Sequence, residues 1–319
     1  MRRYLRKFLG DPRVLDMPAL ARWLLLELVI LPRRPRVAAR AYAQVWTAGG
    51  SPLRVHGEAL RDAVAQRLGD DFRVALGMRY GNPALPDAIG LLVDAGVETL
   101  VVLPLFPQYS EAATGSALAR VREIVGTRGT PPRVVEIGAF HHRPDFAAAW
   151  RAVASPALAA FAPDHVLLSY HGLPERQIRR ADAHGHCLTR DDCCALPEAA
   201  GRGCYRAQCH ATTRTLIDAL GLDPERTTTA FQSRLGRTPW IRPHTDRVLP
   251  ELHAAGVRRL AVLCPAFVAD CLETIEEIGL RARAQWQELG GEALELVPCL
   301  NASEAWADAV AAMVRQAAI

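Results

Sequence analysis

The chain contains two similar stretches, AGVETLVVLPLFP at residues 95–107 and AGVRRLAVLCPAFV at residues 255–268. Each begins as the end of a helix with a glycine turn, continues as a short apolar run, and ends in a loop that contains Pro and Phe. A short apolar run between turn signals is typical of a strand buried in a parallel sheet. Because the second copy lies half a chain length beyond the first, the duplication predicts two similar α/β domains.

Apolar runs alternate with helical patterns along the rest of the chain. Besides the two copies, strands are predicted at residues 72–80, 133–140, 164–172 and 293–300. Helices are predicted at residues 57–68, 86–95, 116–126, 145–161, 206–220, 270–288 and 303–317. Strands that alternate with helices form parallel sheets covered on both faces. We therefore predict two doubly wound, Rossmann-like domains, residues 1–145 and residues 146–319.

The composition indicates a globular protein and excludes several classes. Half of the residues are hydrophobic, and a net charge of +4 is too small to indicate a protein that binds nucleic acid. Lys7 is the only lysine, so Schiff-base catalysis and a Walker-type phosphate site have almost no candidate residue. No secretory signal follows the basic start, which favours a cytoplasmic protein. The sequence does not indicate an oligomeric state.

One apolar segment, ALARWLLLELVILP at residues 19–32, needs a separate explanation. It is interrupted by Arg22 and Glu27 and is too short to span a bilayer. A buried helix is the simpler interpretation. A lip that touches the membrane surface, from which an apolar ligand is taken up, is the alternative.

A histidine and a row of acidic residues follow two of the predicted strands. His171 comes at the end of the apolar run HVLLSYH and is followed by a glycine turn. Because active sites of doubly wound sheets lie beyond the carboxyl ends of the strands, His171 is a candidate base or metal ligand. Asp270, Glu273 and Glu277 are spaced to share one face of a helix. Such a row suits a pocket that attracts a cation or moves protons, but the spacing alone favours a solvated amphipathic helix.

Three further stretches are candidates for binding. Arg79 and Tyr80 follow a predicted strand, and Tyr109 and Ser110 open a segment rich in Ser, Thr and Gly that suits an anion. The stretch FQSRLGRTPWIRPHTD at residues 231–246 is typical of a long ordered loop, and such loops are often functional.

Five of the eight cysteines gather in one part of the chain, at Cys187, Cys193, Cys194, Cys204 and Cys209. In a reducing cytosol, clustered cysteines are more often metal ligands or redox groups than disulfides. An iron–sulfur cluster and a zinc site both take four thiolates. The residues alone therefore do not distinguish between an iron–sulfur cluster, a zinc site and a disulfide pair.

Five motifs, in this order along the chain, resemble those of the ferrochelatases: RYGNPAL, LPLFPQYSEAATGS, SYHGLPER, FQSRLGRTPWIRPHTD and CPAFVADCLETIEEI. The resemblance covers essentially the whole chain and implies a chelatase-like fold with a cleft between two domains. It implies a lyase of haem biosynthesis that inserts ferrous iron into protoporphyrin IX. Coproporphyrin, another tetrapyrrole or another divalent metal are alternatives within this class. A porphyrin-binding or iron–sulfur sensor protein without catalysis is the alternative from another class.

The resemblance also implies roles for single residues. His171 and Glu273 match the family's catalytic pair, which handles the iron and the porphyrin protons, and Glu277 continues the acidic line as a further ligand of the substrate iron. Contacts with the porphyrin are expected from Arg79, Tyr80, Tyr109, Ser110 and Trp240.

The chain departs from the family pattern in three places. The family begins with a strand that carries an N-L-G-x-P loop, and this chain starts after it, so we expect the first strand of the N-terminal domain to be missing. Arg281 stands where a third acid often continues the acidic line. A Cys-rich insertion at residues 186–205 is expected to bind a two-iron two-sulfur cluster, as in some bacterial members of the family, with zinc as the second interpretation. The expected ligands are Cys187, Cys194, Cys204 and Cys209, with Cys193 as the alternative.

Overall fold

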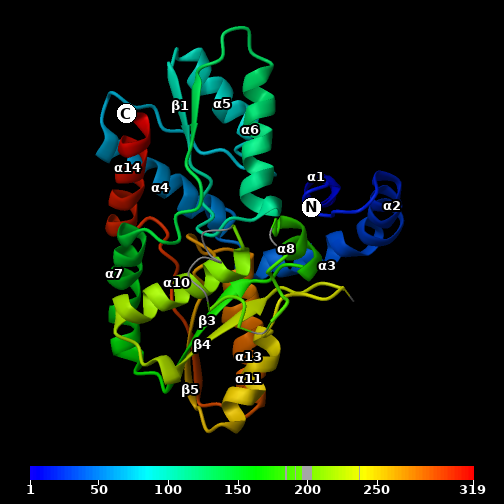
Figure 1. Ribbon diagram of the computed structural model, residues 1–319, viewed down its shortest axis with the longest axis vertical. Coiled ribbons are helices and arrows are strands. Elements are labelled where there is room, and N and C mark those ends of the chain that lie inside the picture. The colour runs from blue at the N-terminus through cyan, green and yellow to red at the C-terminus, as the bar shows by residue number, and fades with distance from the viewer. Residues whose placement is uncertain (184, 191, 196–202, 237) are drawn as a thin grey trace. The chain divides into compact units, whose positions relative to one another are not determined.

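The structure is a computed structural model that describes residues 1–183, 185–190, 192–195, 203–236 and 238–319. The chain forms two compact units (Figure 1). Unit 1 comprises Met1–Pro104, Ser110–Gly138 and Ala307–Ile319, and unit 2 comprises Leu105–Tyr109 and Ala139–Trp306. The predicted domain boundary at residues 145 and 146 stays a prediction. Part of the predicted insertion at 186–205 lies outside the described residues.

Unit 1 is mostly helical and contains a small parallel sheet. Its elements are α1 (Arg2–Gly10), α2 (Ala19–Leu24), the π-helix η1 (Leu25–Ile30), α3 (Leu31–Val45), α4 (Pro52–Leu68), α5 (Leu85–Asp94), β1 (Thr99–Val102), the π-helix η2 (Glu111–Gly115), α6 (Ser116–Gly126), β2 (Arg133–Glu136) and most of α14 (Glu304–Ala318). β1 and β2 pair in parallel, with Thr99 opposite Arg133. Helices α5 and α6 cover this pair and bury Ile89, Leu100 and Val121 in a common core.

The strand predicted at residues 72–80 is not formed. Residues 72–77 belong to no strand, and Met78 alone makes an isolated parallel bridge, to Ala84. A strand is stabilised by the hydrogen bonds and side-chain contacts of a neighbouring strand, and an apolar run does not supply them by itself. This prediction was therefore wrong.

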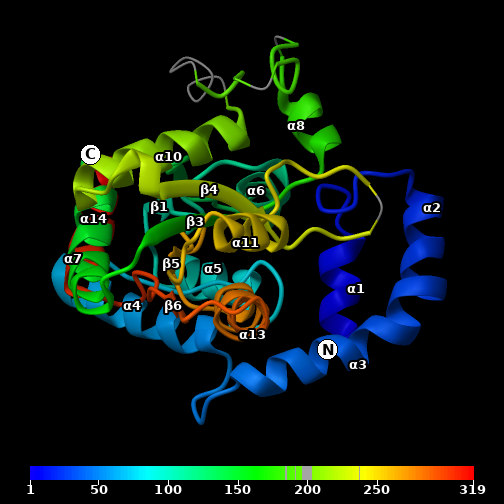
Figure 2. The same cartoon turned by 90° about the horizontal axis from the view of Figure 1, so that it is seen from below.

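Unit 2 contains a four-stranded parallel sheet in the order β4-β3-β5-β6. Its elements are α7 (Pro144–Phe161), β3 (His165–His171), α8 (Glu175–Ala181), α10 (Tyr205–Leu220), the 3₁₀ helix η3 (Pro224–Arg226), β4 (Thr227–Gln232), α11 (Thr245–Ala254), β5 (Arg259–Leu263), α12 (Leu272–Thr274), the π-helix η4 (Ile275–Ala282), α13 (Arg283–Glu288) and β6 (Ala293–Leu296). Figure 2 shows α7 and α10 on one side of these strands and α11 and α13 on the other. The predicted α/β class with parallel sheets is confirmed.

The central strand β3 places the candidate histidine. Residues 165–170 are all buried, because β4 and β5 flank the strand and helices cover it, and only His171 at its end is partly exposed. The two copies of the duplication supply β1 and β5, as predicted. β4 is not predicted by the sequence, because TTTAFQ has a polar start. Its threonines are β-branched and suit a strand, and Thr228 and Thr229 bond their hydroxyl groups to His165 and Thr213.

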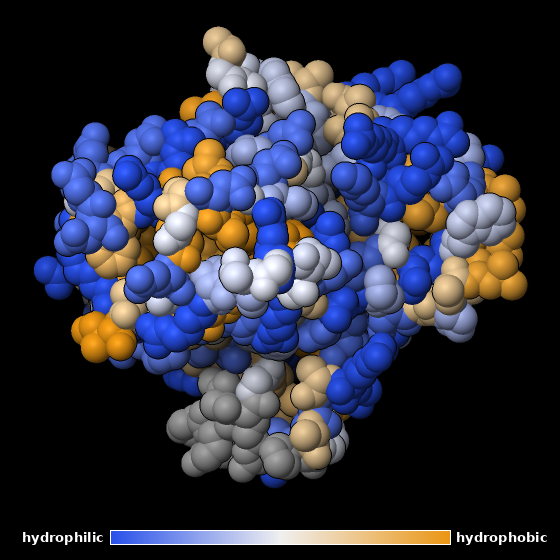
Figure 3. All heavy atoms as spheres, turned by 90° about the horizontal axis from the view of Figure 1, so that it is seen from above, coloured by the Kyte–Doolittle hydropathy of each residue, from blue (hydrophilic) through white to orange (hydrophobic). Residues whose placement is uncertain are grey.

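The N-terminal helices α2, η1 and α3 carry apolar side chains on their surface. Leu20, Trp23, Leu28 and Val29 are between 50% and 69% exposed. In Figure 3 the hydrophobic patch at the right edge lies over these helices. None of the helices in the described part of the chain has the length and apolar character that crossing a bilayer requires.

Candidate active site

His171 lies at the carboxyl end of β3, where its side chain is partly exposed. Its Nδ1 lies 2.6 Å from the carbonyl oxygen of Gly172. Because a carbonyl oxygen only accepts hydrogen bonds, Nδ1 is the donor, and Nε2 carries the lone pair in the neutral form of the ring. The ring packs against Trp240 and Phe267, with centroid distances of 6.4 and 6.2 Å. His171 can therefore accept a proton or bind a metal through Nε2.

The main chain around His171 is held on two sides. The N–H of Gly172 donates to the carbonyl of Gln232 at 2.8 Å. A Cβ atom at Gly172 would lie only 2.8 Å from that carbonyl oxygen, so the close approach requires glycine. On the other side, the hydroxyl group of Tyr205 donates to the carbonyl oxygen of His171 at 2.7 Å. These contacts fix the backbone from which the imidazole projects.

The acidic residues lie on a helix whose middle is a π-helix. Leu272–Thr274 is α-helical, Ile275–Ala282 is π-helical, and Arg283–Glu288 returns to the α form. π-Helical turns often occur at functional sites. Glu273 and Glu277 both lie on this helix.

The prediction that Asp270 shares their helix face was wrong, because Asp270 precedes the helix. Its carboxylate accepts from the amide of Asn301 at 2.8 Å and from the hydroxyl of Thr274 at 3.0 Å. Asp270 therefore anchors the start of the helix to the neighbouring loop. Spacing in the sequence does not reveal such a contact with a residue 31 positions away.

The end of β4 holds the acidic helix. Gln232 lies opposite His171 in the β3–β4 ladder, and its side-chain amide donates to the main-chain carbonyl of Glu273 at 2.7 Å. Ser233 donates its N–H and its hydroxyl to the carboxylate of Glu277, at 2.8 and 2.5 Å. Ser233 has φ +67°, a strained conformation for serine, and such strain often occurs at functional sites. Gln232 thus connects the histidine strand to the acidic helix.

Arg281 ends the acidic row with a positive charge. Its guanidinium lies 2.9 Å from Glu276 and 3.8 Å from Glu277. A cavity of about 200 Å³ lies here, with Glu277, Arg281, Ser233 and Asp246 among its lining residues. Its size suits a hydrated ion or a few water molecules rather than a macrocycle.

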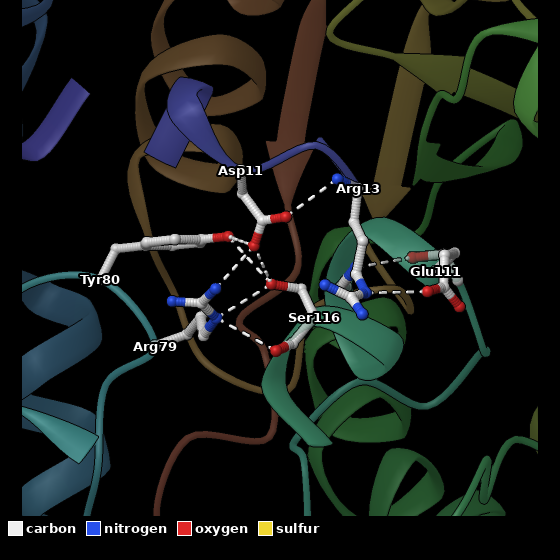
Figure 4. Close-up of polar contacts among 8 residues, drawn as sticks. Asp11, Arg13, Arg79, Tyr80, Glu111 and Ser116 are labelled. Atoms are coloured by element: carbon white, nitrogen blue, oxygen red, sulfur yellow. Dashed lines mark hydrogen bonds and ion pairs between the residues drawn. The ribbon is translucent and has the colours of Figure 1, made fainter. Parts of the chain in front are cut away.

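In unit 1, Arg79 and Tyr80 form a hydrogen-bonded group with Asp11 and Ser116 (Figure 4). One carboxylate oxygen of Asp11 accepts from Arg79 at 2.6 Å, Tyr80 at 2.9 Å and Ser116 at 2.6 Å. Burial acts to raise the pKa of Asp11, but the hydrogen bonds of Ser116, the Arg13 amide and Tyr80, with the charge of Arg79, lower it overall. Burial raises the pKa of Tyr80 to about 12. Asp11 therefore stays ionised and holds the side chains of Arg79 and Tyr80 in place.

Sequence reasoning missed Asp11, and it did not single out Gln232 and Ser233 within the candidate stretch 231–246. The only available signal for Asp11 was a lone acid within the basic segment MRRYLRKFLGDPRV. The signal for Gln232 and Ser233 was that this polar pair directly follows the apolar dipeptide Ala-Phe, which itself follows three threonines.

The other predicted porphyrin contacts also make contacts within the protein. Ser110 is buried, and its hydroxyl accepts from the N–H of Ala113 at the start of η2. The Tyr109 N–H donates to the side chain of Gln208 at 2.7 Å. The Trp240 indole donates to the carbonyl of Leu235 at 3.0 Å.

Four of the five clustered cysteines lie together, and we call Cys187, Cys193, Cys194 and Cys204 the cysteine quartet. All eight cysteines of the chain are buried free thiols. The Sγ atoms of Cys193 and Cys194 are 3.8 Å apart, and the pKa of Cys204 is lowered to about 6, chiefly because the Cys194 thiol donates to its sulfur, with a smaller contribution from Cys187. Across the described residues, no three His, Cys, Asp or Glu side chains are arranged to hold a metal ion as they stand.

Cys209, the remaining predicted ligand, lies further along α10. It is fully buried, and burial raises the pKa of its thiol well above the usual range. Cys193, the alternative ligand, contacts Cys194 directly through sulfur, whereas the thiol of Cys209 interacts with Cys204.

Comparison with known proteins identifies the family of this chain. The sequence profile of the family described as Ferrochelatase matches residues 1–318. A ferrochelatase of Coxiella burnetii (strain CbuK_Q154) is 46% identical over 99% of this chain and 88% of that protein, and one of Legionella pneumophila (strain Lens) is 43% identical over 98% and 92%. Among solved structures, SirB from Bacillus subtilis with Fe3+ has a similar fold, with a TM-score of 0.54 and 12% identity over 84% of this chain and 92% of that one. This chain therefore belongs to the ferrochelatase family.

Proposed function

We infer that this chain inserts ferrous iron into a porphyrin, the lyase reaction of its family in haem biosynthesis. Ferrous iron and the porphyrin are the substrates, and two protons are released as the metal enters. The observation that carries the proposal is the position of His171, which lies at the carboxyl end of β3 with Nδ1 bonded to the Gly172 carbonyl and is linked through Gln232 to the acidic helix.

The side chains of the site suit this chemistry. The pyrrole N–H protons must leave before four nitrogens can bind the metal, so an unprotonated imidazole is useful as a proton acceptor or as a transient ligand. We propose that Glu273 supplies a carboxylate for the second proton or for the iron. Glu277, held by Ser233, provides fixed negative charge that attracts the cation, and Arg281 limits how far this charge extends.

Anaerobic assays with ferrous iron test the proposal. Purified protein is mixed with protoporphyrin IX or with coproporphyrin, and haem absorbance is followed. Turnover with either porphyrin supports insertion, and the ratio of kcat/KM values identifies the substrate. Tight porphyrin binding without turnover would instead support the non-catalytic sensor.

We also propose that the protein is cytoplasmic and touches the membrane surface through α2, η1 and α3. Trp23 and Leu28 expose apolar surface there, and the exposed Arg33 and Arg34 follow on α3. This combination suits a bilayer with anionic headgroups. Vesicles that contain an anionic lipid should co-sediment the protein, and Trp23→Ser with Leu28→Ser should abolish this. Equal sedimentation of both proteins would contradict the contact.

We propose that the cysteine quartet holds a two-iron two-sulfur cluster. Such a cluster takes four thiolates, and the quartet supplies four buried sulfur atoms from a short part of the chain. This assignment replaces Cys209 with Cys193 as the fourth ligand. When bound, the cluster supplies cross-links that order a segment with little apolar content, since metalation of a porphyrin needs no electron transfer. Protein purified without oxygen should contain two iron atoms and two sulfides per chain, whereas one zinc and no colour would overturn the proposal.

A further inference from the structure

Three buried polar side chains of unit 2 form a hydrogen-bonded series that ends at Glu273. The hydroxyl groups of Thr245 and Ser169 lie 2.8 Å apart, and Ser169 donates to Oε1 of Gln232 at 2.7 Å. Nε2 of Gln232 then donates to the main-chain carbonyl of Glu273 at 2.7 Å. We call Thr245, Ser169 and Gln232 the buried network, since each of them is at most 4% exposed.

Every bond of the buried network has one direction. Because the Glu273 carbonyl only accepts, Nε2 of Gln232 must face it, and Oε1 must face Ser169. Ser169 gives its only hydroxyl proton to Oε1, so Thr245 is the donor to Ser169. The thiol of Cys264, whose pKa burial raises well above the usual range, adds a weak second donor 3.8 Å from Oε1. Bonds that point the same way strengthen one another and hold the amide towards Glu273.

Gln232 also contacts the segment that carries the histidine. It lies opposite His171 in the β3–β4 ladder, and its main-chain carbonyl accepts from the N–H of Gly172 at 2.8 Å. Ser169 lies two residues before His171, so the two side chains leave the same face of β3. The main chain of Gln232 therefore bonds to the turn after His171, while its side chain bonds to Glu273.

We propose that Gln232 is a positioning residue for iron insertion, and that Ser169 and Thr245 hold its amide in the orientation that fixes Glu273. The amide holds the main chain of Glu273, which sets the point from which the carboxylate projects. A carboxylate that takes a proton or meets the iron has to be placed closely, and a displacement of about 1 Å can slow a reaction about 10²-fold. This inference rests on the proposed function and on the proposed role of Glu273.

The first test replaces the amide by a side chain of similar length. Gln232→Met removes both hydrogen bonds and should lower kcat about tenfold, with KM for the porphyrin changed by less than about twofold. In the Glu273→Gln background the same replacement should lower kcat by less than about twofold, because no carboxylate remains to be placed. A tenfold fall in both backgrounds would indicate general destabilisation and overturn the positioning role.

Hydrogen–deuterium exchange tests the same bond without an activity assay. The peptide that covers residues 272–283 should exchange about tenfold faster in Gln232→Met, the effect of one lost hydrogen bond on local opening. Equal exchange in wild type and variant would show that the amide does not hold the acidic helix, and would overturn the proposal.

Ser169→Ala is a milder variant that leaves the amide in place. It removes the donor that orients Gln232, so kcat should fall about threefold, and adding it to Gln232→Met should change kcat by less than about twofold. Thr213→Val is the matched control, since it also removes a buried hydroxyl group from unit 2, but one that bonds to two hydroxyl groups outside the buried network, at 2.9 and 3.0 Å. An equal fall in kcat for Ser169→Ala and Thr213→Val would contradict a role specific to the network.

The remaining outcomes separate this proposal from the one beneath it. A wild type that inserts iron, with kcat of Gln232→Met within about twofold of it, overturns the positioning role and leaves the enzyme function intact. A wild type that inserts no iron overturns the proposed function itself.

Discussion

Replacement of Asp11 by asparagine should loosen the group that holds Arg79 and Tyr80 in unit 1. Four donors converge on the Asp11 carboxylate, from Arg79, Tyr80, Ser116 and the Arg13 amide. An asparagine keeps one acceptor oxygen and turns an N–H₂ group towards donors. Breaking a fully buried ion pair costs about 3–5 kcal/mol, and we discount this to about 2–3 kcal/mol because the Arg79 side chain is 25% exposed.

Local hydrogen–deuterium exchange measures this loss. Peptides that cover residues 5–17 and 76–84 should exchange about 30-fold to 150-fold faster in Asp11→Asn, because a loss of about 2–3 kcal/mol makes local opening that much more frequent. The matched control is Asp62→Asn, since Asp62 is 62% exposed and its ion pair with Arg61 contributes little. Equal exchange in these peptides for wild type and Asp11→Asn at pH 7 would refute the reasoning.

The difference in stability between wild type and Asp11→Asn should change with pH in one direction. The pKa of Asp11 in the folded protein is below its ordinary value of 3.8, so the unfolded state binds the proton more readily. The ionised carboxylate therefore contributes its full stabilisation above the ordinary value, and this is lost as the pH falls through the lowered one. The stability gap between wild type and Asp11→Asn should be constant near neutral pH and shrink only below about pH 4. A gap that closes between pH 7 and pH 5 would contradict this account.

Three further variants test the proposed active site and metal centre. His171→Ala should lower iron insertion by about 10²-fold to 10⁴-fold without loss of porphyrin binding, and activity within about tenfold of wild type in a steady-state assay would contradict its role. Glu273→Gln keeps the shape and removes the charge, so porphyrin affinity measured by fluorescence should persist while turnover slows. Unchanged turnover would make the acidic helix purely structural. Cys204→Ser should remove the visible absorbance that dithionite bleaches in the wild type, and a spectrum that survives would exclude Cys204 as a ligand.

The sequence predicted the parts of the fold that depend on local pattern. The run that ends at His171 is apolar, short and followed by a glycine turn, and it forms the buried strand β3 as expected. The two copies of the duplication likewise form β1 and β5. In each case the local hydrophobic pattern is sufficient to predict the strand.

Other features depend on contacts between distant residues and were not predictable in this way. Residues 72–77 have a strand-like pattern but no pairing strand, while the polar start of β4 finds partners for its threonine hydroxyls. Asp270 has the spacing of a helix-face residue, yet its bond to Asn301 holds it outside the helix. The binding of Glu277 by Ser233 likewise joins residues 44 positions apart.

The π-helix Ile275–Ala282 has a consequence for how this gene can change over evolution. A π-helical turn accommodates one residue more than an α-helical turn, so Arg281 reaches both Glu277, four positions earlier, and Glu276, five positions earlier. Deleting the exposed Leu280 would remove the additional residue, so the stretch could relax to the α form while the residues on either side keep their present faces. Glu276 and Glu277 would then lie four and three positions before the arginine, and both spacings bring side chains together on an α-helix. A single-codon deletion in this segment should therefore be tolerated better than one within α13, where it would rotate the flanking residues by about 100° relative to each other.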